Sequence, residues 1–123
     1  MKNCKMDLLV ERANNNYDGH VSILKFTCGW KVIFGTVNLE PFTKEYNDIF
    51  SLTCHKTLED AIGECLRNNY NTYMFSDYAE NIKDDMRKDG TVFCENCLSR
   101  DVDINALITC KLCHHSYKNK EWK

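Results

Sequence analysis

Four of the eight cysteines in this 123-residue chain fall into two pairs, and each pair has a two-residue spacer. The pairs are Cys94-Glu-Asn-Cys97 and Cys110-Lys-Leu-Cys113, with 12 residues between them. A two-residue spacer lets both sulfurs of a pair face one point, and thiolates are ligands that a borderline-soft cation such as Zn²⁺ prefers. The spacing therefore predicts one closed metal site, with Cys94, Cys97, Cys110 and Cys113 as ligands and zinc as the cofactor.

Other chemistry at these cysteines is less consistent with the pattern. His114 and His115 follow Cys113 directly, so either can replace one thiolate as the fourth ligand, although four cysteines already complete a tetrahedral shell. A catalytic zinc keeps a position open for water and usually has histidine and carboxylate ligands. A redox CxxC motif is normally single and begins a helix after a strand. We therefore expect a structural site.

The two motifs resemble those of the zinc-ribbon class, over residues 91–117 only. The resemblance implies two knuckles joined by a short hairpin, with residues 91–93 and 103–109 as the strands that lead into them. It does not specify a function, because members include parts of the transcription machinery, nucleic-acid enzymes, ribosomal proteins and adaptors. Many ribbons have a glycine after each CxxC, whereas this chain has Leu98 and His114. A treble-clef arrangement, in which Cys113 opens a short helix, stays open.

The other four cysteines stand singly among apolar residues, and we expect reduced thiols in a core rather than a disulfide framework. The N-terminus has acidic residues and no sustained apolar segment, so we expect no secretory signal and a cytoplasmic location. A second metal site would require single residues from distant segments to converge, and core packing is the simpler interpretation. The single cysteines are Cys4, Cys28, Cys54 and Cys65. The second site would consist of Cys28, Cys54, His55 and Cys65, with His20.

The fold class that the elements predict is α+β. Apolar periodicity predicts a short helix over residues 5–13, strands over 20–28 and 30–37, and a third strand over 49–54. Thr57 is a predicted N-cap of an amphipathic helix that ends near residue 69. We thus expect a three-stranded antiparallel sheet with a covering helix in residues 1–75, a charged connecting helix in 76–90, and the zinc-binding module, ribbon or treble clef, in 91–123.

One further resemblance concerns the segment Thr57-Leu-Glu-Asp-Ala-Ile62, which follows the three-stranded pattern. It is similar to the strand-to-helix junction of HicB-type antitoxins, a degenerate RNase H-like fold. Helix starts of this kind are also generic capping sequences. We transfer no function from this similarity.

Composition limits the functions to consider. The net charge is −2 and no segment is a basic block, which gives little support to nonspecific phosphate binding. No apolar stretch approaches the roughly 20 residues needed to cross a bilayer, so we expect no membrane contact. We find no phosphate-binding glycine loop, nucleophile motif or supported carboxylate pair, and we expect no enzyme.

The prediction is a small non-enzymatic zinc-binding adaptor or inhibitor that acts on a protein partner. The 13 asparagines and single proline fit an AT-rich genome, so a phage-type host-takeover or anti-defence protein is the sharpest version. The alternative is a nucleic-acid-binding or transcription accessory factor that uses the ribbon.

Overall fold

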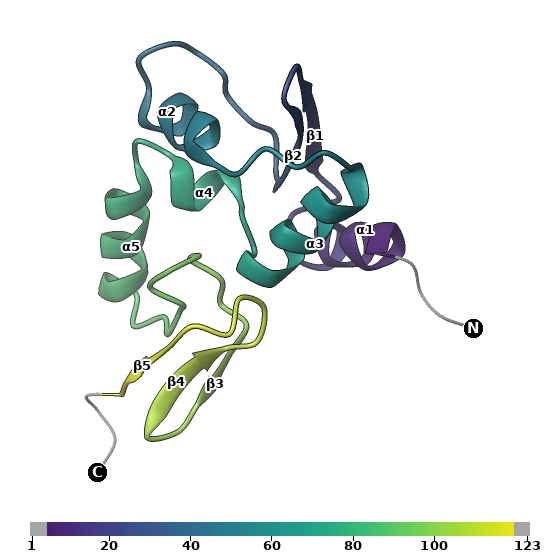
Figure 1. The fold of residues 1–123 in the computed structure, drawn as a ribbon. Helices are drawn as coiled ribbons and strands as arrows, with labels where there is room; N and C mark the ends of the chain where they lie inside the picture. Colours follow the sequence, from purple (N-terminus) through teal and green to yellow (C-terminus); the bar gives the residue numbers. More distant parts are fainter. Residues whose placement is uncertain (1–4, 120–123) are drawn as a thin grey trace.

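The computed structural model describes residues 5–119 and combines helices with two small antiparallel sheets. The hairpin β1–β2 lies beside α1 and α3, and the sheet of β3, β4 and β5 forms the opposite end of the molecule (Figure 1). The elements in chain order are α1 (Lys5–Asn16), β1 (Val21–Phe26), β2 (Gly29–Phe34), α2 (Lys44–Ser51), α3 (Leu58–Asn68), α4 (Thr72–Phe75), α5 (Ala79–Lys88), β3 (Val102–Ile104), β4 (Leu107–Cys110) and β5 (Ser116–Lys118).

The hairpin confirms the first two predicted strands. β1 and β2 pair in antiparallel register from Val21 opposite Phe34 to Phe26 opposite Gly29. Gly29 has φ +143°, and a Cβ atom there would lie 2.0 Å from the carbonyl oxygen of His55. Glycine is therefore required where the chain after α2 comes back against the hairpin. Trp30 and His55 exchange main-chain hydrogen bonds of 2.7 and 3.1 Å at this contact.

The predicted third strand over residues 49–54 is wrong, because residues 44–51 form helix α2 and the N-terminal sheet has two strands. Thr43 caps the helix by accepting a hydrogen bond of 3.1 Å from the amide of Tyr46. At the other end, the buried Lys31 Nζ donates to the carbonyl oxygens of Ile49 and Phe50, at 2.9 Å each. Capping at both ends outweighs the β propensity of the local sequence.

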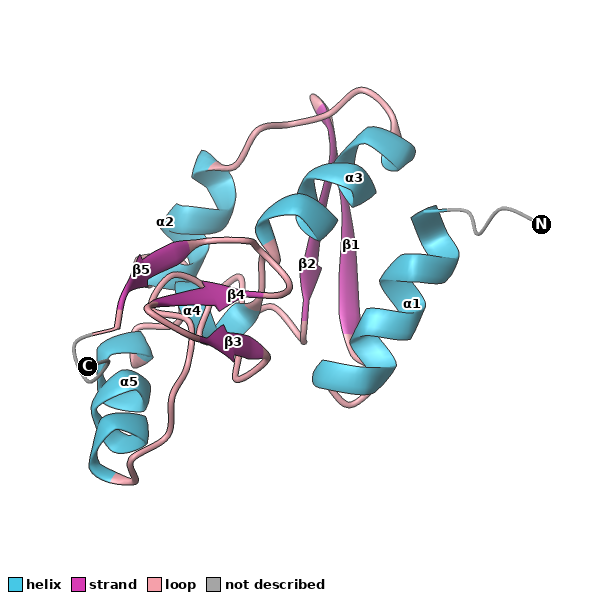
Figure 2. Cartoon of the chain, turned by 90° about the horizontal axis from the view of Figure 1, so that it is seen from below, coloured by secondary structure: helices cyan, strands magenta, loops and turns pink. Residues whose placement is uncertain are grey.

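The core of the N-terminal part lies between α1, α3 and β2, and Figure 2 shows both helices beside the hairpin. Leu9 of α1, Phe34 of β2 and Cys65 of α3 are fully buried there. Thr57 begins α3, and its hydroxyl accepts a hydrogen bond of 3.1 Å from the amide of Asp60, which confirms the predicted cap. Each large apolar side chain buried in this way contributes about 1.5–3 kcal/mol.

Two short helices connect this core to the C-terminal sheet. The sequence did not predict α4, which Asn71 caps by accepting a hydrogen bond of 3.1 Å from the amide of Met74. α5 lies within the predicted connecting helix over 76–90, and its buried Met86 packs against Phe93 and Leu98. α5 therefore contributes to the packing of the C-terminal part as well as connecting to it.

The C-terminal sheet has the strand order β3-β4-β5, with both pairs antiparallel. A strand, Ser116–Lys118, follows Cys113, so the treble-clef helix is wrong for the residues that the structure describes. The predicted strand over 91–93 is also absent, because this segment pairs with no strand in the described chain. Across residues 5–119, no helix has the length and apolar character needed to span a bilayer.

Candidate metal centre

Two tight turns bring the four predicted ligands together. In the first, the amide of Leu98 donates to the carbonyl of Cys94 at 2.9 Å; in the second, the amide of His114 donates to the carbonyl of Cys110 at 3.0 Å. The first turn follows the segment after α5, and the second begins at the end of β4. The matching bonds show that the two CxxC motifs fold into equivalent knuckles.

The four sulfur atoms lie within 4.8 Å of one another. The Sγ atoms of Cys94 and Cys113 are 3.6 Å apart, and those of Cys97 and Cys110 are 3.7 Å apart. A tetrahedral zinc site with Zn–S distances of about 2.3 Å has sulfur-to-sulfur edges of about 3.8 Å. The cluster can hold a metal ion, and its dimensions are compatible with zinc.

Polar hydrogens point at the sulfurs from several directions. Main-chain amides donate at 3.4 Å to Cys94 Sγ, from Cys97, and to Cys110 Sγ, from Leu112 and Cys113. The amide side chain of Asn96 lies 3.6 Å from Cys113 Sγ. Such donors stabilise thiolates, which is the form that binds metal. The donor set therefore fits a soft cation.

Burial and mutual contact perturb the thiol groups. Cys94, Cys97 and Cys110 are at most 1% exposed, and Cys113 is half-buried. The pKa of Cys97 is raised because its thiol hydrogen-bonds to Cys110 and Cys94, and burial adds to the effect. The pKa of Cys110 is lowered because it accepts from Cys94 and Cys97. Metal binding releases the protons of such thiols, because the metal binds the thiolate form.

The departure from the usual glycine after each CxxC does not prevent the knuckle turns. Leu98 has φ +64° and His114 has φ +65°, so both residues occupy the left-handed region that glycine adopts at low cost. The strain is about 1 kcal/mol for a residue with a Cβ atom. Leu98 offsets it by packing against Met86 and Phe93, whereas the side chain of His114 is exposed.

The two histidines after Cys113 lie outside the sulfur cluster. Among residues 5–119, the His, Cys, Asp or Glu group close enough to hold a metal consists of the four cysteines alone. The side chains of His114 and His115 are exposed, and the His115 ring lies 6.3 Å from that of Tyr117. Neither histidine replaces a cysteine in the observed cluster.

The single cysteines differ from the expectation of reduced core thiols. Cys28 and Cys54 form a disulfide that ties the hairpin turn to the loop before α3, because the contact between Trp30 and His55 brings these segments together. Cys65 is a buried free thiol, and burial raises its pKa to about 12. Cys4 lies outside the described residues.

The histidines proposed for a second metal site have other partners. His55 Nε2 pairs with the carboxylate of Glu64, and His20 lies 3.4 Å from the hydroxyl of Thr36. With Cys28 and Cys54 bonded to each other and Cys65 in the apolar core, the second constellation does not converge. Core packing accounts for Cys65 as the sequence suggested.

Sequence reasoning missed two asparagines that contact the cluster from the N-terminal part. Asn69 Nδ2 lies 3.3 Å from Cys97 Sγ, and Asn71 Nδ2 donates to the carbonyl of Cys97 at 2.8 Å. Both residues are 0% exposed. Their position just after α3, within an asparagine-rich stretch, predicts a helix end but not a contact 26 residues further along the chain.

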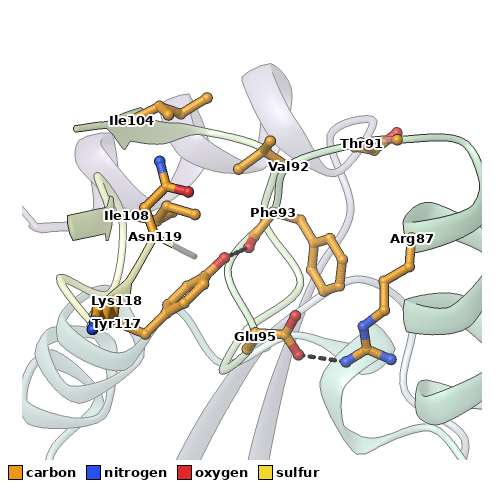
Figure 3. Close-up of a pocket in the computed structure, with 11 residues that line it drawn as sticks. Arg87, Thr91, Val92, Phe93, Glu95, Ile104, Ile108, Tyr117, Lys118 and Asn119 are labelled. Atoms are coloured by element: carbon orange, nitrogen blue, oxygen red, sulfur yellow. Dashed lines mark hydrogen bonds and ion pairs between the residues drawn. The ribbon is translucent and has the colours of Figure 1, made fainter. Parts of the chain in front are cut away.

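A groove of about 750 Å³ lies between the end of α5 and the C-terminal sheet, and Phe93 and Glu95, the neighbours of Cys94, contribute to its lining. Figure 3 shows Val92 and Ile104 at one side of it and the hydrogen bond from Tyr117 to the carbonyl of Phe93 across its floor. The ion pair of Arg87 with Glu95 closes one end, at 2.6 Å. The lining of the groove thus combines apolar side chains with polar and charged ones.

Comparison of the chain with protein-family models, with curated proteins and with solved structures gives no match. The resemblances to zinc ribbons and to HicB-type antitoxins therefore rest on sequence motifs. For the ribbon, the clustered cysteines support the motif. For the antitoxin, the three-stranded pattern before Thr57 is not observed, because residues 44–51 form helix α2.

Proposed function

We propose that the chain is a small non-enzymatic adaptor or inhibitor whose C-terminal part is held by one structural zinc ion and binds another protein. The four-sulfur cluster is the observation that carries this proposal. Four thiolates fill a tetrahedral zinc shell and leave no position for water or substrate. Bound zinc would supply folding energy to a segment with little apolar core of its own.

The distribution of charge favours a protein partner over nucleic acid. Arg87 pairs with Asp84 and Glu95, and Lys111 lies within 4 Å of Asp101 and Asp103. Phosphate binding depends on clustered cations that are free to replace counterions. Residues 91–119 contain three cations and three carboxylates: Arg100, Lys111 and Lys118 against Glu95, Asp101 and Asp103. This part of the chain therefore has no net positive charge when its histidines are neutral.

The groove beside the ribbon is the binding surface in this proposal. Val92 is 38% exposed and Ile104 is 51% exposed, although both are apolar. Val92 makes no main-chain hydrogen bond within residues 5–119. A free main-chain donor and acceptor beside apolar side chains suit an extended peptide segment, which adds as a strand and inserts an apolar side chain. The proposed partner presents such a segment.

An affinity experiment with matched variants tests the proposal. The zinc-loaded protein is used as bait in lysate of its native cells, with and without nuclease, beside Ile104→Glu in the groove and Ile23→Glu on β1. We expect one nuclease-resistant protein that Ile23→Glu retains and Ile104→Glu loses. Recovery that disappears with nuclease would instead support the transcription-factor alternative. Equal capture of the partner by both variants, or capture of no protein, would contradict the proposal that the groove binds a protein partner.

A further inference from the structure

The amide of Asn69, a fully buried residue, uses each of its hydrogen-bonding groups. Nδ2 donates to Tyr17 Oη at 2.7 Å and to Cys97 Sγ at 3.3 Å, and Oδ1 accepts from the guanidinium of Arg12 at 3.3 Å. An asparagine has two N–H donors, so both are used. One side chain therefore connects α1, the residue after it and the first knuckle.

The backbone of Asn69 is held as firmly as its side chain. The residue has φ +53° and caps the C-terminus of α3 in the left-handed conformation, which asparagine tolerates better than most residues. Arg12 also donates to the carbonyl of Leu66 at 2.7 Å, in the last turn of the same helix. The amide therefore has a fixed position relative to Cys97.

Asn71 makes a second link that does not involve sulfur. Its Nδ2 donates to the carbonyls of Asn69 and Cys97, at 2.9 and 2.8 Å, and its Oδ1 accepts from the amide of Met74. Its backbone forms a bridge with Phe34, at the end of β2. Movement of the first knuckle would leave buried amide groups of both asparagines unpaired, which is costly.

We propose that Asn69 and Asn71 are positioning residues of the metal centre and couple metal binding to the N-terminal core. The Asn69 donor fixes the position of Cys97 Sγ, and the Asn71 donor fixes the main chain of the same residue. The same contacts transmit the order of the knuckle to α1, α3 and β2. Metal loading then makes the hairpin core more rigid, and a well-ordered core strengthens metal binding, because such coupling is reciprocal. This inference rests on the proposed metal centre.

The test compares variants of the full-length chain by zinc titration and by hydrogen exchange of peptides from β2 and α3. Asn69→Gly keeps the left-handed backbone and removes the amide, and Asn69→Asp keeps the size but places a carboxylate oxygen near Cys97 Sγ. Asn68→Ala is the control, because Asn68 donates to the carbonyl of Glu64 within α3. We expect zinc affinity to fall about 10-fold to 100-fold in both Asn69 variants and to stay unchanged in the control.

Hydrogen exchange distinguishes a failure of the proposed metal centre from a failure of the proposed coupling. In the unmodified chain and in Asn68→Ala, added zinc should slow exchange in β2 and α3; in Asn69→Gly, zinc should still bind at one ion per chain and slow exchange in the C-terminal sheet alone. If the unmodified chain binds no zinc, the metal centre itself fails and the coupling fails with it. If it binds one zinc while exchange in β2 and α3 does not change, only the coupling is overturned.

Discussion

The two ends of the molecule have different kinds of core. In the N-terminal part, α1, α3 and β2 bury a cluster of aliphatic and aromatic side chains around Leu9 and Phe34. In the C-terminal part, three of the four most buried members of the main cluster are cysteines, and Leu112 is the fourth. The first kind of core folds by removing apolar surface from water, whereas the second brings together four thiol groups that gain stability from a cation.

The two regions share buried contacts in spite of this difference. Met74 packs against the cysteine cluster and also against the cluster around Ile33 and Phe75. The sequence predicted three parts, residues 1–75, 76–90 and 91–123. Whether the first and last parts fold independently of each other stays a prediction. Substitutions in one region test this prediction, because they show whether the other region also loses stability or metal.

Removal of one ligand should have the largest effect. We expect Cys110→Ser to abolish high-affinity zinc binding and to unfold residues 91–119, since structural zinc in finger peptides contributes about 10–16 kcal/mol. The N-terminal core should stay folded, with faster exchange near Asn69. Metal analysis and hydrogen exchange measure both effects. Cys65→Ala is the control: it removes a cysteine from the apolar core and should keep one zinc per chain.

Truncation of the aromatic centre of the N-terminal core should be the next largest effect. Phe34 is fully buried, so Phe34→Ala should lower the free energy of unfolding by about 3–5 kcal/mol, measured by denaturant titration. Zinc stoichiometry should not change. Phe42, which is 97% exposed, provides the matched control, and Phe42→Ala should change stability by less than about 0.5 kcal/mol. A similar loss in both variants would contradict the observed core.

The disulfide stabilises the N-terminal region without contributing to the cysteine cluster. Cys28 and Cys54 lie 26 positions apart in the sequence, and a loop of this length corresponds to a stabilisation of about 3.5 kcal/mol in the chain-entropy model. The double variant Cys28→Ser, Cys54→Ser should lose about that amount in denaturant titration and retain its zinc. Loss of zinc together with the disulfide would mean that these cysteines belong to the metal centre.

The smallest expected effect sharpens the comparison inside the C-terminal region. His114 is exposed at φ +65°, so His114→Gly should relieve backbone strain and raise the stability of the zinc-loaded form by about 0.5–1 kcal/mol. Leu98→Gly has the same backbone advantage but loses packing against Met86 and Phe93, and should be destabilising. Thermal unfolding of the two variants would contradict this account if both shifted in the same direction.

The sequence predicted the parts of the structure that depend on local pattern. Cysteine spacing indicated the four members of the cluster, and the capping residue Thr57 indicated α3, because both signals lie within a few residues of the feature they specify. The run over residues 49–54 was misread since its helix is stabilised by Lys31, a residue on another element. Thr43 was a local signal for that helix, and its capping role was overlooked.

Features that depend on long-range contacts were not predictable. The disulfide forms because the hairpin turn and the loop before α3 meet at Gly29, and nothing near Cys28 or Cys54 specifies that meeting. Asn69 and Asn71 had local signals for a helix end and a cap, but their contact with Cys97 results from tertiary packing.

Native mass spectrometry of the zinc-loaded chain, followed by thiol alkylation, tests the central claim most directly. The account predicts one zinc ion per chain, with Cys94, Cys97, Cys110 and Cys113 protected from alkylation until the ion is removed by a chelator. A chain that binds no zinc, or one that retains its zinc while these four cysteines are freely alkylated, would contradict it.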